Sequence, residues 1–195
     1  MISVTRIFRL GIRFAVWVTP HVKEWNRKRN LNVSEAERNL AARNWSEAEK
    51  HLAAALTERK HSLKKRVEIL LDLEWAQRKQ AKLDQAEQTA RHAIEMAGAT
   101  GDRALKARAM EVLVDVQISQ EKYSDAEQTI REIASLEAGQ AQPDRARLAT
   151  CARKLGTALL KSGRKQEAFE AFQQAASLAE QAFGANHVET AQSLS

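Results

Sequence analysis

The chain is poor in the residue types that usually cross-link or interrupt a fold. Its 195 residues include one cysteine, Cys151, which excludes an intrachain disulfide framework; this side chain is predicted to be a small buried hydrophobe on a helix. There are two prolines, aromatic residues make up 5% of the chain, and no valine-rich alternating segment predicts a strand. Because 44% of the residues are hydrophobic, with alanine and leucine prominent among them, the composition favours an all-α protein.

Motifs for catalysis, metal binding and cofactor binding are also missing. The sequence has no glycine-rich phosphate loop, no CxxC, no HExxH and no carboxylate-rich calcium loop. Its histidines are scattered, with no pair at metal-ligand spacing: His21, His51, His61, His92 and His187. The sequence therefore predicts a protein that is not an enzyme and has no catalytic residue, no cofactor and no metal site.

A surplus of charge is absent from most of the chain. Residues 1–31 contain seven Lys/Arg and one acid, a net charge of +6, whereas residues 32–195 contain 24 bases and 24 acids. Nucleic-acid binding depends on a basic face, so the neutral body argues against a nucleic-acid partner. The basic cluster at residues 59–66 is interpreted as a solvated loop or helix start.

What the chain does contain is one helical pattern, repeated. The stretch NWSEAEKHLAAAL (44–56) recurs at 82–94, 122–134 and 164–176, and its central alanines are 38, 40 and 42 residues apart. These register alanines are Ala48, Ala86, Ala126 and Ala168. Apolar residues four and seven positions after most of them trace one helix face, so each copy predicts a helix that packs closely on its neighbours. Periods of this length are typical of stacked repeat arrays.

The starts of these helices carry a capping pattern in three of the four copies. Ser46 with Glu49, Asp84 with Glu87, and Ser124 with Glu127 fit the capping box, in which a short side chain accepts from an early backbone N–H. We expect these pairs to begin their helices, with Gly163 marking the turn in the fourth copy.

A second predicted helix precedes each copy. Its ranges are 34–43, 67–81, 106–120 and 147–163, and breaks at 98–102, 139–144 and 183–187 separate the units. The pattern of helix, tight turn, helix and loop predicts a solenoid of antiparallel helix pairs, because one pair cannot bury its apolar face alone.

These motifs resemble the tetratricopeptide repeat. The second helix carries aromatic-x-x-Ala-x-x-x-apolar-x-x-Ala, and residues 154–180, KLGTALLKSGRKQEAFEAFQQAASLAE, match the pattern best. The unit length and FGANHVETAQSL (183–194) are similar to the long-repeat variety of kinesin light chains. The resemblance implies an all-α, right-handed solenoid with units at about 34–60, 64–98, 103–138 and 144–182, plus a partial fifth at 186–195. Since that fifth unit lacks a polar cap, a longer array or a docked tail is expected.

In tetratricopeptide arrays the first helices line a concave face that grips a peptide, so the resemblance implies binding residues on those helices. The candidates here are Asp72, Trp75, Arg78, Lys79, Arg108, Asp115, Arg153, Lys154 and Lys161. The set leans basic, which predicts an acidic or C-terminal segment as partner, with Trp75 as anchor. The Lys/Asn constellation with which chaperone-binding repeats hold a terminal carboxylate is not matched.

The first thirty residues form a separate basic, amphipathic segment. At helical spacing Arg6, Arg9 and Arg13 fall on one stripe, and Phe8, Phe14 and Trp17 lie on the broad apolar remainder. This pattern predicts a helix on an anionic membrane surface, so the protein is expected in the cytoplasm, peripheral on the inner face of a membrane. A spanning helix, a secretory signal, a transit peptide and a helix packed on the first repeat remain open; three arginines each costing about 2.5–3.5 kcal/mol at the bilayer centre disfavour spanning.

Three functional hypotheses follow from these features. The first is a scaffold at a membrane surface that recruits a protein partner. The second is a soluble adaptor or self-assembling oligomer, and the third is a regulatory module of a longer protein.

Overall fold

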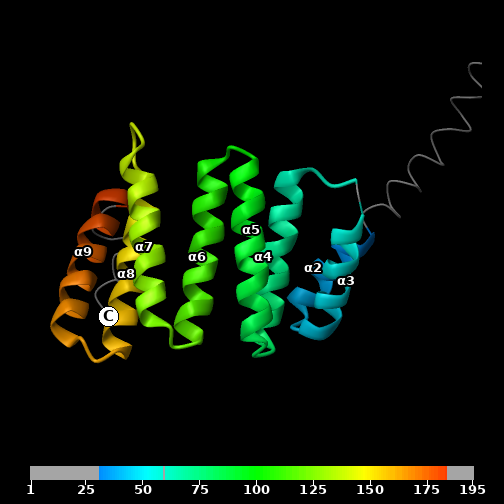
Figure 1. Ribbon diagram of the computed structural model, residues 1–195, viewed down its shortest axis with the longest axis horizontal. Coiled ribbons are helices and arrows are strands. Elements are labelled where there is room, and N and C mark those ends of the chain that lie inside the picture. Colours follow the sequence, from blue (N-terminus) through cyan, green and yellow to red (C-terminus); the bar gives the residue numbers. More distant parts are fainter. Residues whose placement is uncertain (1–30, 59, 184–195) are drawn as a thin grey trace, which may run out of the picture.

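The computed structural model describes residues 31–58 and 60–183. Within them the chain forms eight helices and no strand (Figure 1). In chain order these are α2 (Leu31–Ala41), α3 (Trp45–Thr57), α4 (Leu63–Lys79), α5 (Leu83–Ala99), α6 (Arg103–Ser119), α7 (Tyr123–Ala138), α8 (Arg145–Lys161) and α9 (Lys165–Phe183).

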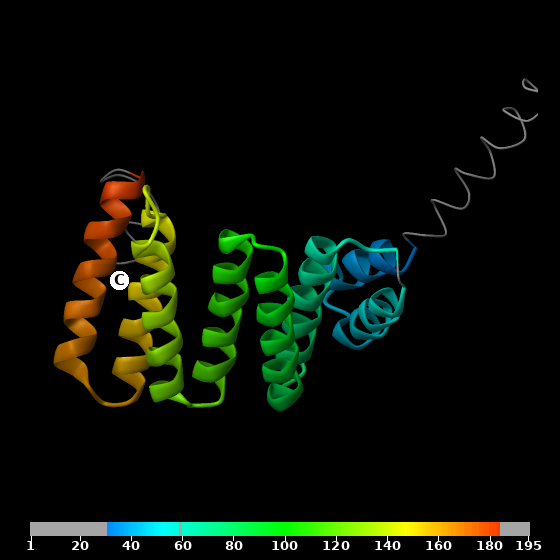
Figure 2. The same cartoon turned by 45° about the horizontal axis from the view of Figure 1, so that its top comes forward.

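The helices stack as a row of antiparallel pairs. Each helix packs on the next along the chain, from the α2–α3 pair at one end to the α8–α9 pair at the other (Figures 1 and 2). The first helices of neighbouring pairs also touch, α4 with α6 and α6 with α8, whereas α5 and α7 make at most marginal contact. The predicted all-α solenoid of helix pairs is therefore confirmed. We call α4, α6 and α8 the A helices, and α3, α5, α7 and α9 the B helices.

The core is built on the register alanines. Ala48, Ala86 and Ala126 are completely buried, and Ala168 is 1% exposed, as expected for the contact stripe of each B helix. A methyl side chain lets the neighbouring helix approach closely, and larger side chains one turn further on, such as Leu52 and Ile130, fill the remaining space. Cys151 is 2% exposed, and burial raises the pKa of its thiol to about 12, so the prediction of an inert buried hydrophobe is confirmed.

Four identical turns join the two helices of each pair. Arg43, Ala81, Glu121 and Gly163 each lie five residues before a register alanine, and all have positive φ, between 57° and 84°. The N–H of the following residue donates to the carbonyl five residues back, as Lys82 N does to Gln77 O at 3.0 Å. This is the Schellman ending of a helix, in which one left-handed residue reverses the chain.

The tight turn makes the predicted capping boxes wrong. The B helices begin at Trp45, Leu83 and Tyr123, and the residues before them make no side-chain cap. Because the left-handed residue stands only two positions ahead of the helix, Ser46, Asp84 and Ser124 fall inside the first turn. Glu49, Glu87 and Glu127 lie about one turn further along these helices and do not take part in capping.

Side-chain caps occur instead at the starts of the A helices. Ser62, Asp102 and Asp144 accept from the backbone N–H three residues on, at 3.3, 3.0 and 3.0 Å. The A helices consequently start two to four residues earlier than their apolar patterns suggested, and α2 begins three residues earlier.

The three glutamates join each unit to the next. Glu49 accepts from Lys82 at 2.6 Å, Glu87 from Lys122 at 2.7 Å, and Glu127 from Arg164 at 2.8 Å. In every case the cation lies in the turn before the following B helix. We call this row of inter-unit ion pairs the glutamate ladder; the fourth unit has Phe169 at the corresponding position.

Predictions for the two ends of the sequence fall outside the described residues. This applies to the membrane-contact candidates, Arg6, Phe8, Arg9, Arg13, Phe14 and Trp17, and to the partial fifth unit at 186–195. Among the helices that the structure does describe, none is long and apolar enough to span a membrane.

Candidate functional site

The predicted binding residues all lie on the A helices. Asp72, Trp75, Arg78 and Lys79 are on α4, Arg108 and Asp115 are on α6, and Arg153, Lys154 and Lys161 are on α8. Each is at least partly exposed. Because the A helices contact one another directly, they place these side chains along one continuous surface, which we call the A-helix face.

Ion pairs tie the middle of the A-helix face together. Lys154 Nζ lies 2.7 Å from Asp115 Oδ1 and donates to the Glu111 carbonyl at 2.9 Å, so α8 is fastened to α6. Arg147 bridges Glu111 at 2.7 Å and the buried Glu137 at 2.8 Å. The carboxylates hold the Arg147 pKa above its ordinary value against the effect of burial. Lys154 and Arg147 therefore stabilise the contacts between helices within the fold.

Two further candidates on α4 are also partnered. Arg78 donates to Glu74 at 2.8 Å, and the Glu74 side chain is 1% exposed. Burial raises the pKa of Glu74 although Arg78 opposes the shift, so removal of Arg78 would leave a carboxylate buried without its partner. The Trp75 ring packs edge-on against Trp45 of α3, with ring centroids 4.7 Å apart.

Asp72 and Arg108 face one another from adjacent A helices without forming an ion pair. Burial raises the pKa of Asp72, while Lys65 and Arg108 partly oppose the shift. Arg108 itself is exposed. The pair therefore leaves a cation available to solvent at the centre of the surface.

Three of the candidates have no ionic partner within the described part of the chain: Lys79, Arg153 and Lys161. Lys79 and Lys161 are exposed, and Arg153 is half-buried. Together with Arg108 they give the A-helix face positive charges that are not neutralised by ion pairs among the described residues. A partner's carboxylates could bind there without displacing an internal ion pair.

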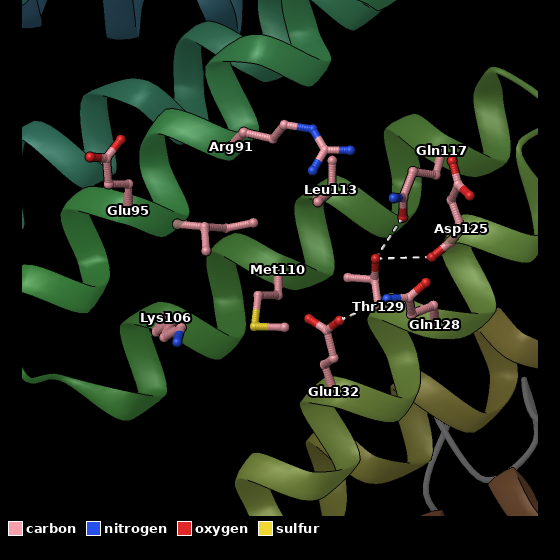
Figure 3. Close-up of a pocket in the computed structure, with 11 residues that line it drawn as sticks. Arg91, Glu95, Lys106, Met110, Leu113, Gln117, Asp125, Gln128, Thr129 and Glu132 are labelled. Atoms are coloured by element: carbon pink, nitrogen blue, oxygen red, sulfur yellow. Dashed lines mark hydrogen bonds between the residues drawn. The ribbon is translucent and has the colours of Figure 1, made fainter.

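A pocket of about 520 Å³ lies elsewhere, among α5, α6 and α7. Its lining comes from two B helices and the A helix between them, and Figure 3 shows these side chains converging on one space. None of the predicted binding residues lines it. The lining residues are Arg91, Ile94, Glu95, Lys106, Met110, Leu113, Gln117, Asp125, Gln128, Thr129 and Glu132.

Sequence reasoning missed two kinds of residue. Glu74 and Arg147 hold the A-helix face together, and the i,i+4 spacing of Glu74 and Arg78 was a readable signal for one of these contacts. The pocket had no such signal, because its walls come from helices about 40 residues apart. Within the described residues no group of three or more His, Cys, Asp or Glu side chains is placed to hold a metal ion.

Comparison with known families identifies the repeat. A family model described as tetratricopeptide repeat matches residues 148–189, which include most of α8 and all of α9. A comparison with curated protein sequences gives no match.

Three solved structures show the same architecture. BtubC (BKLC) from P. vanneervenii superposes with a TM-score of 0.62 at 17% identity, covering 81% of this chain and 62% of that one. A putative kinesin light chain from Podosopora anserina with nearly identical TPR-like repeats gives 0.65 at 14%, covering 84% and 81%. The apo form of RapI gives 0.71 at 10%, covering 90% of this chain and 50% of RapI. The match thus spans less than two thirds of BtubC and of RapI.

The chain therefore contains a tetratricopeptide repeat at residues 148–189. Its last described unit carries the sequence signature of the repeat, and the described array has the fold of kinesin light chain-like repeats. Solenoid arrays of stacked helix pairs present extended surfaces that suit contacts with other proteins.

Proposed function

We propose that the protein is a non-enzymatic scaffold that recruits a protein partner through its A-helix face. The observation that carries the proposal is the set of cations on that face that form no ion pair with the described residues: Lys79, Arg108, Arg153 and Lys161. They are spread over three consecutive A helices, which suits an extended segment better than a small molecule. The partner segment is acidic or ends in a free carboxylate, because arginine and lysine recognise carboxylates through charge-assisted hydrogen bonds.

Trp75 is the proposed apolar anchor of the same surface. Its ring is partly exposed on α4, and its edge-on contact with Trp45 holds it in one orientation. A rigid aromatic side chain loses little conformational entropy on binding, and tryptophan is enriched among the residues that dominate binding energy.

The test is affinity capture with the purified chain of residues 1–195, followed by mass spectrometry of the retained proteins. A triple variant, Arg108→Glu, Arg153→Glu and Lys161→Glu, reverses the unpaired charge, and a matched variant, Lys50→Glu, Arg131→Glu and Lys165→Glu, reverses three exposed cations on B helices. We expect a partner retained by the wild type and by the matched variant but not by the A-helix variant. Equal retention by all three proteins would show that the partner binds elsewhere.

We further propose that residues 1–30 tether this scaffold to an anionic membrane surface. The segment supplies the chain's entire net charge of +6, and basic residues near anionic headgroups contribute roughly 1 kcal/mol each. Apolar side chains such as Phe8, Phe14 and Trp17 would enter the interface between headgroups and acyl chains.

Sedimentation with lipid vesicles tests the tether. The full chain should sediment with vesicles rich in phosphatidylserine and remain in the supernatant with pure phosphatidylcholine, and binding should weaken as salt rises. A chain lacking residues 1–30 should stay in the supernatant with both. Equal sedimentation of the two chains would rule the tether out.

A further inference from the structure

The pocket among α5, α6 and α7 has an apolar floor. Met110 and Leu113 of α6 form that floor, and each is 4% exposed. On the α7 side Thr129 donates to Gln117 at 3.0 Å, which satisfies the polar side chains at the base (Figure 3). The volume of about 520 Å³ can take several side chains of a docked segment, but no neighbouring helix fills it.

The rim of this pocket carries acidic side chains that form no ion pair with a cation of the described residues. Glu95 comes from α5, and Asp125 and Glu132 come from α7. Two basic residues also line the pocket. Arg91 donates to Glu87 through hydrogen bonds of 2.7 and 3.1 Å, and Lys106 is the other. The opening is therefore net acidic once the internal pairs are counted.

The preceding junction, among α3, α4 and α5, has the same floor without the acids. In register, Met110 and Leu113 correspond to Leu70 and Leu73, and the Gln117–Thr129 bond corresponds to Gln77–Thr89 at 2.8 Å. The rim positions corresponding to Glu95, Asp125 and Glu132 are Thr57, Gln85 and His92. The acidic rim is therefore absent from the preceding junction and is not a property that every repeat carries.

We propose that this pocket docks residues 1–30 of the chain itself, from the same molecule or from a second copy. The chain is charge-balanced from residue 32 onward, and its surplus of +6 is confined to residues 1–31. That segment alternates arginines with apolar residues, as in Arg6-Ile7-Phe8-Arg9-Leu10. Its apolar side chains match the floor, and its arginines match the carboxylates of the rim.

The docking is independent of the A-helix face, because the pocket shares no residue with it. It uses the segment that we also propose as a membrane tether, so the two states exclude each other. Docking in the absence of lipid would keep the apolar side chains of residues 1–30 out of water. The experiment below is therefore done without lipid, so that its failure and the failure of the membrane tether are distinguishable.

Site-specific photo-crosslinking of the full chain tests the proposal. Benzoylphenylalanine placed at Gln128, which is exposed on the rim, should yield crosslinked peptides from residues 1–30. The same probe at Gln88, the register equivalent on α5, is the matched control and should yield few. Neutralising the rim with Glu95→Gln, Asp125→Asn and Glu132→Gln should reduce the Gln128 yield at least threefold while circular dichroism remains that of the wild type.

The result that overturns the proposal is equally defined. Absence of peptides from residues 1–30 at position 128, equal yields at 128 and 88, or a yield unchanged by rim neutralisation would each show that the pocket does not hold this segment. Mixing isotope-labelled and unlabelled chains then assigns the crosslinks to the same molecule or to a second copy, and both assignments are consistent with docking.

Discussion

At the scale of single residues, the fold depends on one unusual backbone conformation used four times. Arg43, Ala81, Glu121 and Gly163 all adopt positive φ, yet only the last is a glycine. A side chain in this region brings Cβ close to the following carbonyl oxygen, at a cost of about 1–2 kcal/mol. The packing of the surrounding helices therefore holds Arg43, Ala81 and Glu121 in a backbone conformation that is unfavourable for residues other than glycine.

Exchanging glycine and alanine at these turns should change stability in opposite directions. We predict that Ala81→Gly raises the free energy of unfolding by about 1 kcal/mol, because Ala81 is exposed and loses only an unfavourable Cβ. Gly163→Ala, at φ 84°, should lower it by a similar amount. Urea denaturation followed by circular dichroism measures both, and a loss of stability in Ala81→Gly would contradict the account of the turns.

At the scale of helices, the contact between α8 and α9 pairs a glycine with a large aromatic side chain. The position twelve residues before the register alanine holds Glu74, Val114 and Gly156, and the position four after it holds Ala90, Ile130 and Phe172. In the last unit Gly156 packs against Phe172, and a Cβ on Gly156 would lie 2.7 Å from the Phe172 ring. The glycine is required there by the close approach of α9 to α8.

A substitution at this contact should be costly, and a second substitution should repair it. Gly156→Ala should lower the free energy of unfolding by about 1–3 kcal/mol through overpacking, and adding Phe172→Ile should recover part of the loss. The control is Gly98→Ala within α5, where nothing lies within 4 Å of an added Cβ; it should be neutral or slightly stabilising. Equal effects at both glycines, measured by thermal unfolding, would contradict the packing argument.

The glutamate ladder makes the stability of the array sensitive to acid. Hydrogen bonds from Lys122 and Arg91 lower the pKa of Glu87 from 4.5 to about 2. Because the folded-state pKa is the lower one, the ionised carboxylate stabilises the fold above about pH 4.5, and this contribution is lost as the pH falls toward 2.

Replacing Glu87 should remove that dependence. Glu87→Gln should be less stable than the wild type at pH 7, and the difference should shrink as the pH falls from 4.5 to 2. Melting temperatures across this range measure the effect, with Glu180→Gln on an exposed position of α9 as the control expected to match the wild type at pH 7. A gap that stays constant across the range would mean that the ladder does not act through Glu87 ionisation.

The sequence predicted the helices well and their ends poorly. The apolar stripes around Ala48, Ala86, Ala126 and Ala168 were enough to predict the B helices, because close packing on a neighbour leaves a strict period. The capping boxes failed because the position of a cap depends on the preceding turn, and the left-handed residues Arg43, Ala81 and Glu121 are not ones that a sequence pattern predicts. The true caps, Ser62 and Asp102, lie outside the apolar periodicity that was used to bound the A helices.

At the scale of the whole molecule, the array presents two surfaces of different charge. The A-helix face has cations that form no ion pair in the described part of the chain, whereas the pocket between α5 and α7 has an acidic rim. The A-helix face could be predicted because its residues all lie on the A helices, which recur at the repeat spacing. The pocket could not be predicted, since it is formed where three helices from different parts of the sequence meet. The identity of the protein that binds the A-helix face could not be predicted either, because it depends on the sequence of that other protein.

The most direct test of the central claim is a titration of the chain of residues 1–195 with two fluorescent peptides that differ only in charge. Each is a twelve-residue peptide with a free C-terminus and one leucine, the first otherwise alternating glutamate with serine and the second alternating lysine with serine. Fluorescence anisotropy should show saturable binding of the acidic peptide, weakened at least tenfold by the triple variant Arg108→Glu, Arg153→Glu and Lys161→Glu, and unchanged by the matched variant at Lys50, Arg131 and Lys165. Acidic-peptide binding that the two variants weaken equally, or that is absent in the wild type, would contradict the assignment of the A-helix face as the surface that recruits the partner.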